Sequence, residues 1–267
     1  MKLDELQVEI RPRTAGQTAA MAARMLQHRP GPLLAAYACY ALPTFGLATL
    51  SLHVWQLHPF WAFSLCLLLG PVFSPPLVTT LGHLVFTPTV SFGLVARQTS
   101  RRFFPFLFLL LVNRVLLLLG LAALVVPGLY LWRSSWFLGP IVLLEGSPLG
   151  ASFRRGRRFA AGFHGHVLAH AAHTAVLLAY LSLAAASLLH FVGVKLFGLS
   201  FAWVGNLTLL DGYTSLVLLA GFALAAPFAT LVWFFVYLDV RTRKEGWDLE
   251  IAFRARVAQL ERSSAQG

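Results

Sequence analysis

Six long apolar stretches dominate this sequence, and they constrain its fold more than any other feature. They cover, approximately, residues 32–54, 59–86, 104–126, 129–144, 166–191 and 214–238. A helix needs about 20 apolar residues to cross the hydrocarbon core of a bilayer, and only the fourth stretch is short of that length. Backbone polar groups in lipid must be satisfied within the chain, and no stretch alternates as a barrel strand does. The sequence therefore predicts an all-α, polytopic membrane helix bundle with about six transmembrane helices.

The amino-acid composition also indicates that lipid surrounds these stretches. Of the 267 residues, 58% are hydrophobic and only 12% are charged, which gives a mean hydropathy of +0.72. A soluble domain of this length exposes more charge. Both cysteines, Cys39 and Cys66, lie inside apolar stretches, so we expect small packing residues and no disulfide.

The basic residues predict how the bundle is oriented. The net charge is +11, but Lys and Arg occur in short clusters between apolar stretches, which favours anionic lipid over nucleic acid as the partner. With six spans and both termini in the cytoplasm, 18 of the 21 basic residues fall on the cytoplasmic side, as the positive-inside rule requires. The 18 are Lys2, Arg11, Arg13, Arg24, Arg29, Arg97, Arg101, Arg102, Arg154, Arg155, Arg157, Arg158, Arg241, Arg243, Lys244, Arg254, Arg256 and Arg262.

The same pattern divides the chain into three parts. Residues 1–30 are predicted to be a cytoplasmic N-terminal arm with an amphipathic helix, 31–238 the six-span domain, and 239–267 a cytoplasmic amphipathic tail. Segment 192–212 mixes apolar and charged residues, so we interpret it as an interfacial or re-entrant piece on the outer side.

Three local signals mark the ends of these cytoplasmic helices. Thr14 and Gln17 have the spacing of a capping box, which predicts a helix start in the arm. The pair Ser147-Pro148 predicts a second interfacial helix. Gly246 is placed to end the last span, and Asp248 to cap a helix in the tail.

Two blocks of the sequence resemble a known group of proteins. The first runs from Pro127-Gly128-Leu129-Tyr130 through Arg133, Pro140, Leu144-Glu145-Gly146 and Ser147-Pro148-Leu149 to Phe153-Arg154-Arg155; the second is residues 237–250, and a weaker third is residues 10–14. Together they resemble bacterial six-span proteins related to the membrane domain of glycerophosphoryl diester phosphodiesterases. That resemblance implies a bacterial inner-membrane protein. In the namesake enzymes a separate soluble domain carries catalysis, and none is expected after residue 250, so the activity is not carried over.

Three histidines form the sharpest group of potential ligands. The spacing of His166, His170 and His173 places them on one helix face, where imidazoles could bind zinc or relay protons. No Cys, Asp or Glu lies within a helical turn, so Glu145 or Asp239 could complete a site only through tertiary packing. We therefore expect no metal and no cofactor, and interpret the histidines as polar groups facing the bundle or the headgroups.

Three charged residues lie within or beside spans. Arg114 is near the middle of the third stretch, where a charge costs about 2.5–3.5 kcal/mol on insertion scales, so it should face protein or water. Arg133 lies near an outer end and can extend to the headgroups, and Glu145 lies at an inner end. Pairing of Arg114 with Glu145 is one interpretation, and a path for a solute is the other.

The exit of the last span carries a predicted structural latch. Asp239 near a helix C-terminus opposes the helix dipole, so it should pair with Arg243 at i+4 or with Arg154 or Arg155 of the preceding inner segment. Arg241 and Glu245 have the same i+4 spacing. Such pairs would attach the tail to the bundle.

These features predict a non-enzymatic scaffold, assembly or accessory protein that contacts anionic lipid or a partner membrane protein at the cytoplasmic face. No Walker loop, Gly-x-Ser-x-Gly or His-Glu-x-x-His motif is present. The alternative is a transporter or channel for a small solute, metal ion or proton. Pro71, Pro75 and Pro76 break the second stretch, and broken helices can expose backbone groups to a substrate.

Overall fold

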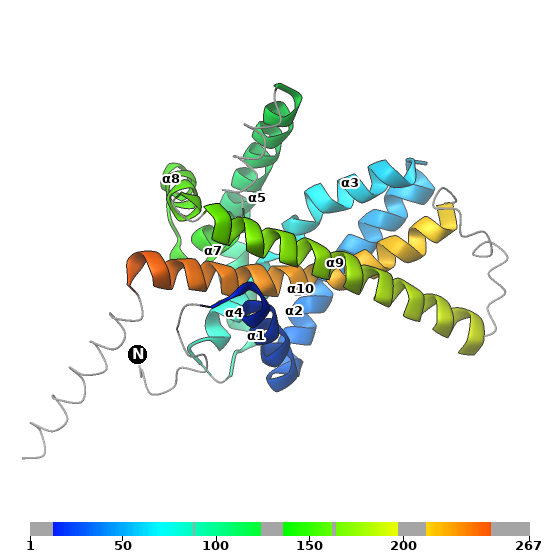
Figure 1. Ribbon diagram of the computed structural model, residues 1–267, viewed down its shortest axis with the longest axis horizontal. Helices are drawn as coiled ribbons and strands as arrows, with labels where there is room; N and C mark the ends of the chain where they lie inside the picture. Colours follow the sequence, from blue (N-terminus) through cyan, green and yellow to red (C-terminus); the bar gives the residue numbers. More distant parts are fainter. Residues whose placement is uncertain (1–12, 88, 124–135, 162–163, 197–211, 247–267) are drawn as a thin grey trace, which may run out of the picture.

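The computed structural model describes residues 13–87, 89–123, 136–161, 164–196 and 212–246, and these residues contain helices but no strand (Figure 1). The first half contains α1 (Ala15–His28), α2 (Pro30–Thr49), η2 (Leu50–Val54), α3 (Pro59–Leu69), η3 (Gly70–Phe73), α4 (Pro75–Leu84) and α5 (Phe92–Ala123). The second half contains α7 (Leu138–Pro140), η4 (Ile141–Glu145), α8 (Leu149–Ala160), α9 (His164–Phe191), η5 (Val192–Leu196) and α10 (Gly212–Glu245). The predicted all-α class is confirmed for this part of the chain.

Four helical segments are long and apolar enough to cross a membrane, and a bent pair can be counted as a fifth. The four are Pro30–Val54, Phe92–Ala122, Gly165–Phe191 and Leu216–Glu245. In the pair, Pro59–Phe73 and Pro75–Leu84 meet at 46°. Proline removes a backbone donor and crowds the preceding turn of a helix. The break predicted from Pro71, Pro75 and Pro76 is therefore present, between Phe73 and Pro75.

The described residues do not provide all six predicted spans. The fourth predicted stretch, 129–144, lies partly outside them, and its described remainder from residue 136 is a turn followed by α7 and the π-helical turn η4. That remainder is too short to cross a bilayer by itself. The helix that contains the third predicted stretch, 104–126, begins earlier than that stretch. It starts at Phe92 and includes Arg97, Arg101 and Arg102.

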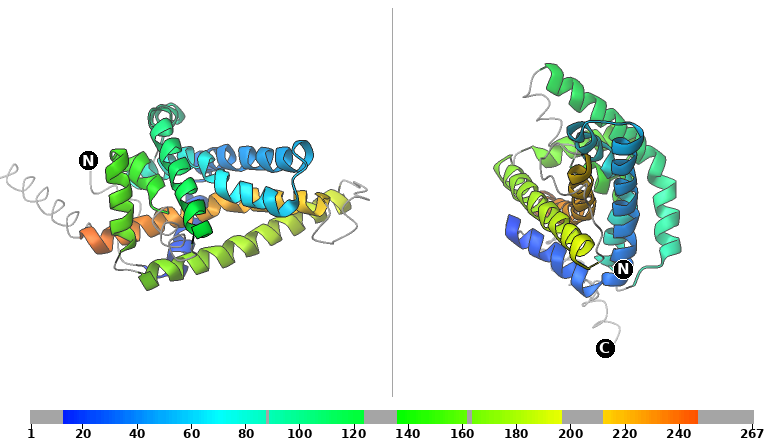
Figure 2. Two further views of the ribbon diagram at one scale, coloured as in Figure 1. Left: turned by 90° about the horizontal axis from the view of Figure 1, so that it is seen from above. Right: turned by 90° about the vertical axis from the view of Figure 1, so that its right-hand side faces the viewer.

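Helix α10 lies at the centre of the bundle. Figure 2 shows it between α9 and α2, antiparallel to α9. Half of the residues in its most apolar part are buried, compared with 11% in the corresponding part of α9. Gly221 permits close contact with α9, because a Cβ at this position would collide with the backbone oxygen of Ser182 and lie 2.9 Å from the backbone nitrogen of Ala186.

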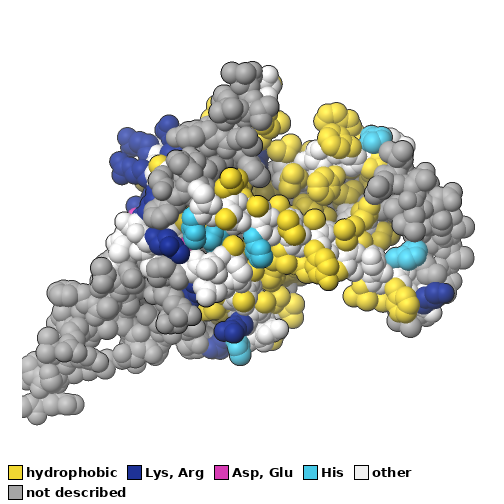
Figure 3. All heavy atoms as spheres, in the orientation of Figure 1, with side chains coloured by type: hydrophobic (Ala, Val, Ile, Leu, Met, Phe, Trp, Pro, Cys, Tyr) yellow, Lys and Arg dark blue, Asp and Glu magenta, His cyan; other side chains and the backbone are white. Residues whose placement is uncertain are grey.

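The surface of the long helices is strongly apolar. Exposed large side chains on α9 and α5 include Leu168, Val176, Leu183, Leu118 and Leu119. Figure 3 shows hydrophobic side chains over the middle of the molecule and Lys and Arg gathered at the end where α8 lies. Water disfavours an apolar surface of this extent, and lipid does not, which agrees with a protein that spans a membrane.

Local signals in the sequence correctly placed several helix ends. The capping box at Thr14 is present, with the Thr14 N–H donating to Gln17 Oε1 at 3.0 Å. Gly246 follows α10 with φ of 58°, a left-handed conformation that favours glycine. Helix α8 begins at Leu149, one residue later than the Ser147-Pro148 pair predicted. The predicted tail helix after Asp248 lies outside the described residues.

Candidate functional site

Polar contacts gather at one end of the bundle, where four helices meet. The residue before the N-cap of α1, the start of α9, Arg155 of α8 and the C-terminal end of α10 contribute to them. Two groups of side chains can be distinguished, one around Asp239 and one around Glu145. Both are built on the last turns of α10.

Asp239 is the centre of the first group. Its side chain is fully buried. Oδ1 accepts the Arg13 N–H at 2.6 Å, and Oδ2 lies 3.0 Å from Arg243 Nε and 2.7 Å from His166 Nε2. Arg243 also donates to the Arg13 carbonyl oxygen at 3.0 Å, so this carboxylate and this guanidinium together bind the backbone before α1.

The predicted contact between Asp239 and Arg243 is therefore present, but the predicted alternative partners lie elsewhere. Arg155 pairs with Glu145 (Nε to Oε2, 2.5 Å) and with Glu245 (Nη2 to Oε1, 2.6 Å). Arg154 is exposed. Arg155 thus joins α8 to η4 and α10 through two glutamates, and the latch role of these residues stays a prediction.

Glu145 is the centre of the second group. The Tyr237 hydroxyl donates to Glu145 Oε1 at 2.5 Å, and Arg241 lies 3.8 Å from the same oxygen. Arg241 makes the predicted i+4 pair with Glu245 at 2.9 Å. Pairing of Glu145 with Arg114, one of the two interpretations above, is not what the structure shows, because Arg155 and Tyr237 occupy both carboxylate oxygens.

Two of the three histidines belong to the Asp239 group. The rings of His166 and His170 lie 4.2 Å apart between centroids, and one ligand atom from each, together with one from Asp239, lies within 4.8 Å of the others. His173 is exposed and is outside this set. The carboxylate that the histidine spacing lacked is supplied by α10, 73 residues from His166. No local signal in the sequence could have shown this contact.

Arg114 and its neighbour Asn113 lie on α5, away from both groups. Asn113 is fully buried, and neither of its amide atoms has a hydrogen-bond partner among the described residues. Arg114 is half-buried, and its Nε also lacks such a partner within this part of the chain. Arg133 lies outside the described residues.

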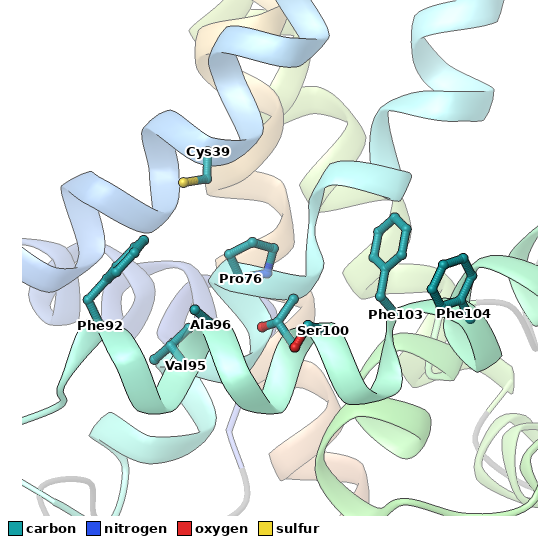
Figure 4. A pocket seen from close by; sticks show the side chains of 9 residues that line it. Cys39, Pro76, Phe92, Val95, Ala96, Ser100, Phe103 and Phe104 are labelled. Carbon is teal, nitrogen blue, oxygen red and sulfur yellow. The ribbon is translucent and has the colours of Figure 1, made fainter.

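An apolar groove lies between α2, α4 and the first half of α5 (Figure 4). Its volume is about 290 Å³. Nine residues line it: Cys39, Pro76, Phe92, Val95, Ala96, Thr99, Ser100, Phe103 and Phe104. On the same helix, Arg97 and Arg101 are exposed beside residues that line the groove. The sequence analysis missed this groove, because it depends on how three helices pack.

Comparisons of the chain with models of protein families, with curated proteins and with solved structures found no match. The resemblance to proteins related to the membrane domain of glycerophosphoryl diester phosphodiesterases stays a prediction. The described part of its first block contains Glu145 and Arg155, which form the ion pair that fixes α8. The ion pair is a structural reason for Glu145 and Arg155 to occur together in this block.

Proposed function

We propose that this protein is a non-enzymatic integral protein of a bacterial inner membrane, an accessory or scaffold protein that binds anionic lipid headgroups through α8 at the cytoplasmic face. One observation carries the proposal. Three exposed arginines of α8, Arg154, Arg157 and Arg158, have side chains that make no hydrogen bond or ion pair with the described residues. Cations on an interfacial helix that have no partner within the described part of the chain are available to phosphate headgroups.

The attachment of α8 supports this proposal. Arg155 binds Glu145 and Glu245, and Lys244 donates to the carbonyl oxygens of Arg158 and Ala161. These contacts fix α8 against the end of α10. Because the helix is already held in place, binding a headgroup does not have to order it, which lowers the entropic cost of lipid binding.

Contacts between the residue before the N-cap of α1 and the end of α10 support a cytoplasmic location for these two parts of the chain. Arg13 contacts Asp239 and Arg243, so the start of α1 and the end of α10 lie at the same end of the bundle, together with α8. The Leu143 carbonyl oxygen in η4 accepts hydrogen bonds from Gln98 and Arg102 in the first part of α5. The chain leaves this side of the bundle along α5 and is back on the same side at η4. Such returns give an even number of crossings, and the positive-inside rule then places the arginine-rich end in the cytoplasm.

Replacing Arg154, Arg157 and Arg158 together by glutamine is expected to remove most of the stabilisation that anionic lipid gives the protein. Each basic residue near an anionic surface contributes about 1 kcal/mol. The measurement is the Tm of the purified chain in neutral detergent with added phosphatidylglycerol or phosphatidylcholine. Lys195→Gln, which removes one exposed charge at the far end of α9, should keep the response to phosphatidylglycerol. Equal stabilisation of the triple variant and the wild type by phosphatidylglycerol would contradict the proposal.

Passage of a small solute, metal ion or proton is the second candidate function. It is favoured by the amide atoms of Asn113 and the Nε of Arg114, which have no hydrogen-bond partner among the described residues. Buried polar groups without partners inside a span are costly unless water or a solute reaches them. Transport predicts that vesicles containing the protein take up a small solute and that Arg114→Met abolishes the uptake. Arg97→Met, an exposed position on the same helix, is the matched control. A vesicle flux no greater than that of empty vesicles would exclude this candidate.

A further inference from the structure

Two imidazoles and one carboxylate converge where α9 meets α10. His166 and His170 are one helical turn apart on α9, and Asp239 faces them from the last turns of α10. One ligand atom of each lies within 4.8 Å of the other two. Asp239 and His170 are each only 1% exposed, so water competes little for these groups.

The hydrogen bonds of His170 define which of its nitrogens can bind a ligand. Nδ1 lies 2.8 Å from the carbonyl oxygen of His166. A carbonyl oxygen can only accept, so Nδ1 carries the proton and the neutral ring presents a lone pair at Nε2. Nε2 is buried and has no hydrogen-bond partner among the described residues. A buried imidazole lone pair without a donor is costly, and a metal ion would satisfy it.

The carboxylate is held by groups that do not belong to the three ligands. The backbone N–H of Arg13 donates to Oδ1 and Arg243 Nε donates to Oδ2, so two groups outside the ligand set fix the orientation of the Asp239 carboxylate. Metal-binding histidines usually donate their second nitrogen to a carbonyl or carboxylate, which fixes the ring and its tautomer. His170 has this arrangement, with the His166 carbonyl as acceptor.

We propose that His166, His170 and Asp239 bind one divalent transition-metal ion, with Zn²⁺ as the best match to the ligand set. Two imidazoles and one carboxylate form a three-ligand zinc site that leaves the fourth position for water. Imidazole ligands disfavour Mg²⁺ and Ca²⁺, which prefer oxygen. Independent of the proposed lipid binding, this assignment gives the protein a second ligand and a cross-link between α9 and α10.

Binding requires one local exchange of partners. His166 Nε2 lies 2.7 Å from Asp239 Oδ2, and because an ionised carboxylate only accepts, the proton of this hydrogen bond belongs to Nε2. The metal ion takes the place of that proton at Nε2, and the neutral ring then carries its one proton on Nδ1, so metal uptake requires a change of tautomer and no net release of a proton. Arg243, 3.0 Å from the same oxygen, repels the incoming cation and limits the affinity.

The test is Zn²⁺ binding to the purified full-length chain in detergent after removal of metals with a chelator. Titration calorimetry should give one Zn²⁺ per chain, and Co²⁺ should give the intense visible absorption of a four- or five-coordinate ion. His170→Leu should weaken binding by more than about tenfold, the lower limit found when even an outer partner of a metal site is lost. This variant leaves the contacts of Asp239 with Arg13 and Arg243 in place, and its Tm without metal reports whether it folds.

His173→Leu is the matched control, because His173 is an exposed histidine three residues further along the same helix. It should bind Zn²⁺ as the wild type does. A wild type that binds no Zn²⁺, or a folded His170→Leu variant that binds it unchanged, would overturn the proposal. Neither result bears on the lipid proposal, whose variants lie on α8.

Discussion

Replacing Asp239 by alanine is expected to lower the free energy of unfolding by about 3 kcal/mol, the lower end of what breaking a buried ion pair costs. The carboxylate is fully buried and binds Arg13, His166 and Arg243 at once. Its removal leaves the Arg13 N–H without its acceptor and the Arg243 guanidinium without its anion. The partial exposure of Arg243, at 28% of its side chain, keeps the effect near this lower end.

Unfolding by sodium dodecyl sulfate, measured in the presence of a chelator, separates this effect from any metal. Hydrogen exchange of α1 gives a second readout, because Asp239 holds the residue before the N-cap of that helix. Amides of Ala15–His28 should exchange faster in the variant. Glu245→Ala is the control, since its ion pairs are exposed and such pairs are worth about 0–1 kcal/mol. Equal losses in the two variants would show that Asp239 is only one more surface charge.

Replacing Gly221 by alanine is expected to destabilise the protein by about 1–3 kcal/mol, the range for an added group in a tightly packed interior. Its Cβ would collide with the Ser182 carbonyl oxygen and lie 3.0 Å from Ala186 Cβ, and backbone atoms cannot move aside as a flexible side chain can. The two helices must separate to accept the methyl group. That loss exceeds the gain of up to about 1 kcal/mol that alanine has over glycine inside a helix.

Gly46→Ala gives a control of opposite sign. Gly46 lies inside α2, and a Cβ there would meet nothing within 4 Å. We expect this variant to be neutral or slightly stabilised, because only the helix propensity changes. The measurement is the midpoint of unfolding by sodium dodecyl sulfate for both variants in one detergent. A Gly221→Ala variant as stable as Gly46→Ala would mean that α9 and α10 pack less closely than the structure shows.

Features that depend on neighbouring residues were predicted correctly from the sequence. The apolar stretches predicted an all-α protein with several helices long and apolar enough to span a membrane, and the prolines predicted the break between α3 and α4. The capping box at Thr14, the end of α10 at Gly246 and the i+4 pairs of Asp239 with Arg243 and of Arg241 with Glu245 are also present. Each follows from the geometry of a single helix, in which residues three or four apart are neighbours.

Features that depend on which helices meet were decided by the tertiary structure. Arg155 was expected to be available to Asp239, but the two glutamates lie closer to it and Asp239 faces α1 and α9 instead. The fourth apolar stretch was expected to form a span, yet its described part is a turn and two short helical pieces. Arg114 and Glu145, both inside or beside apolar stretches, lie in separate environments.

The proposed metal site combines one feature that the sequence determined with one that only the tertiary structure decided. The sequence alone determined that His166 and His170 share a helix face, because the period of the α-helix is fixed. Only the packing of α10 against α9, permitted by Gly221, could bring Asp239 to that face and leave His173 exposed. Contacts between residues 73 positions apart depend on which apolar faces bury each other, and many pairings of apolar helices satisfy the same hydrophobic pattern.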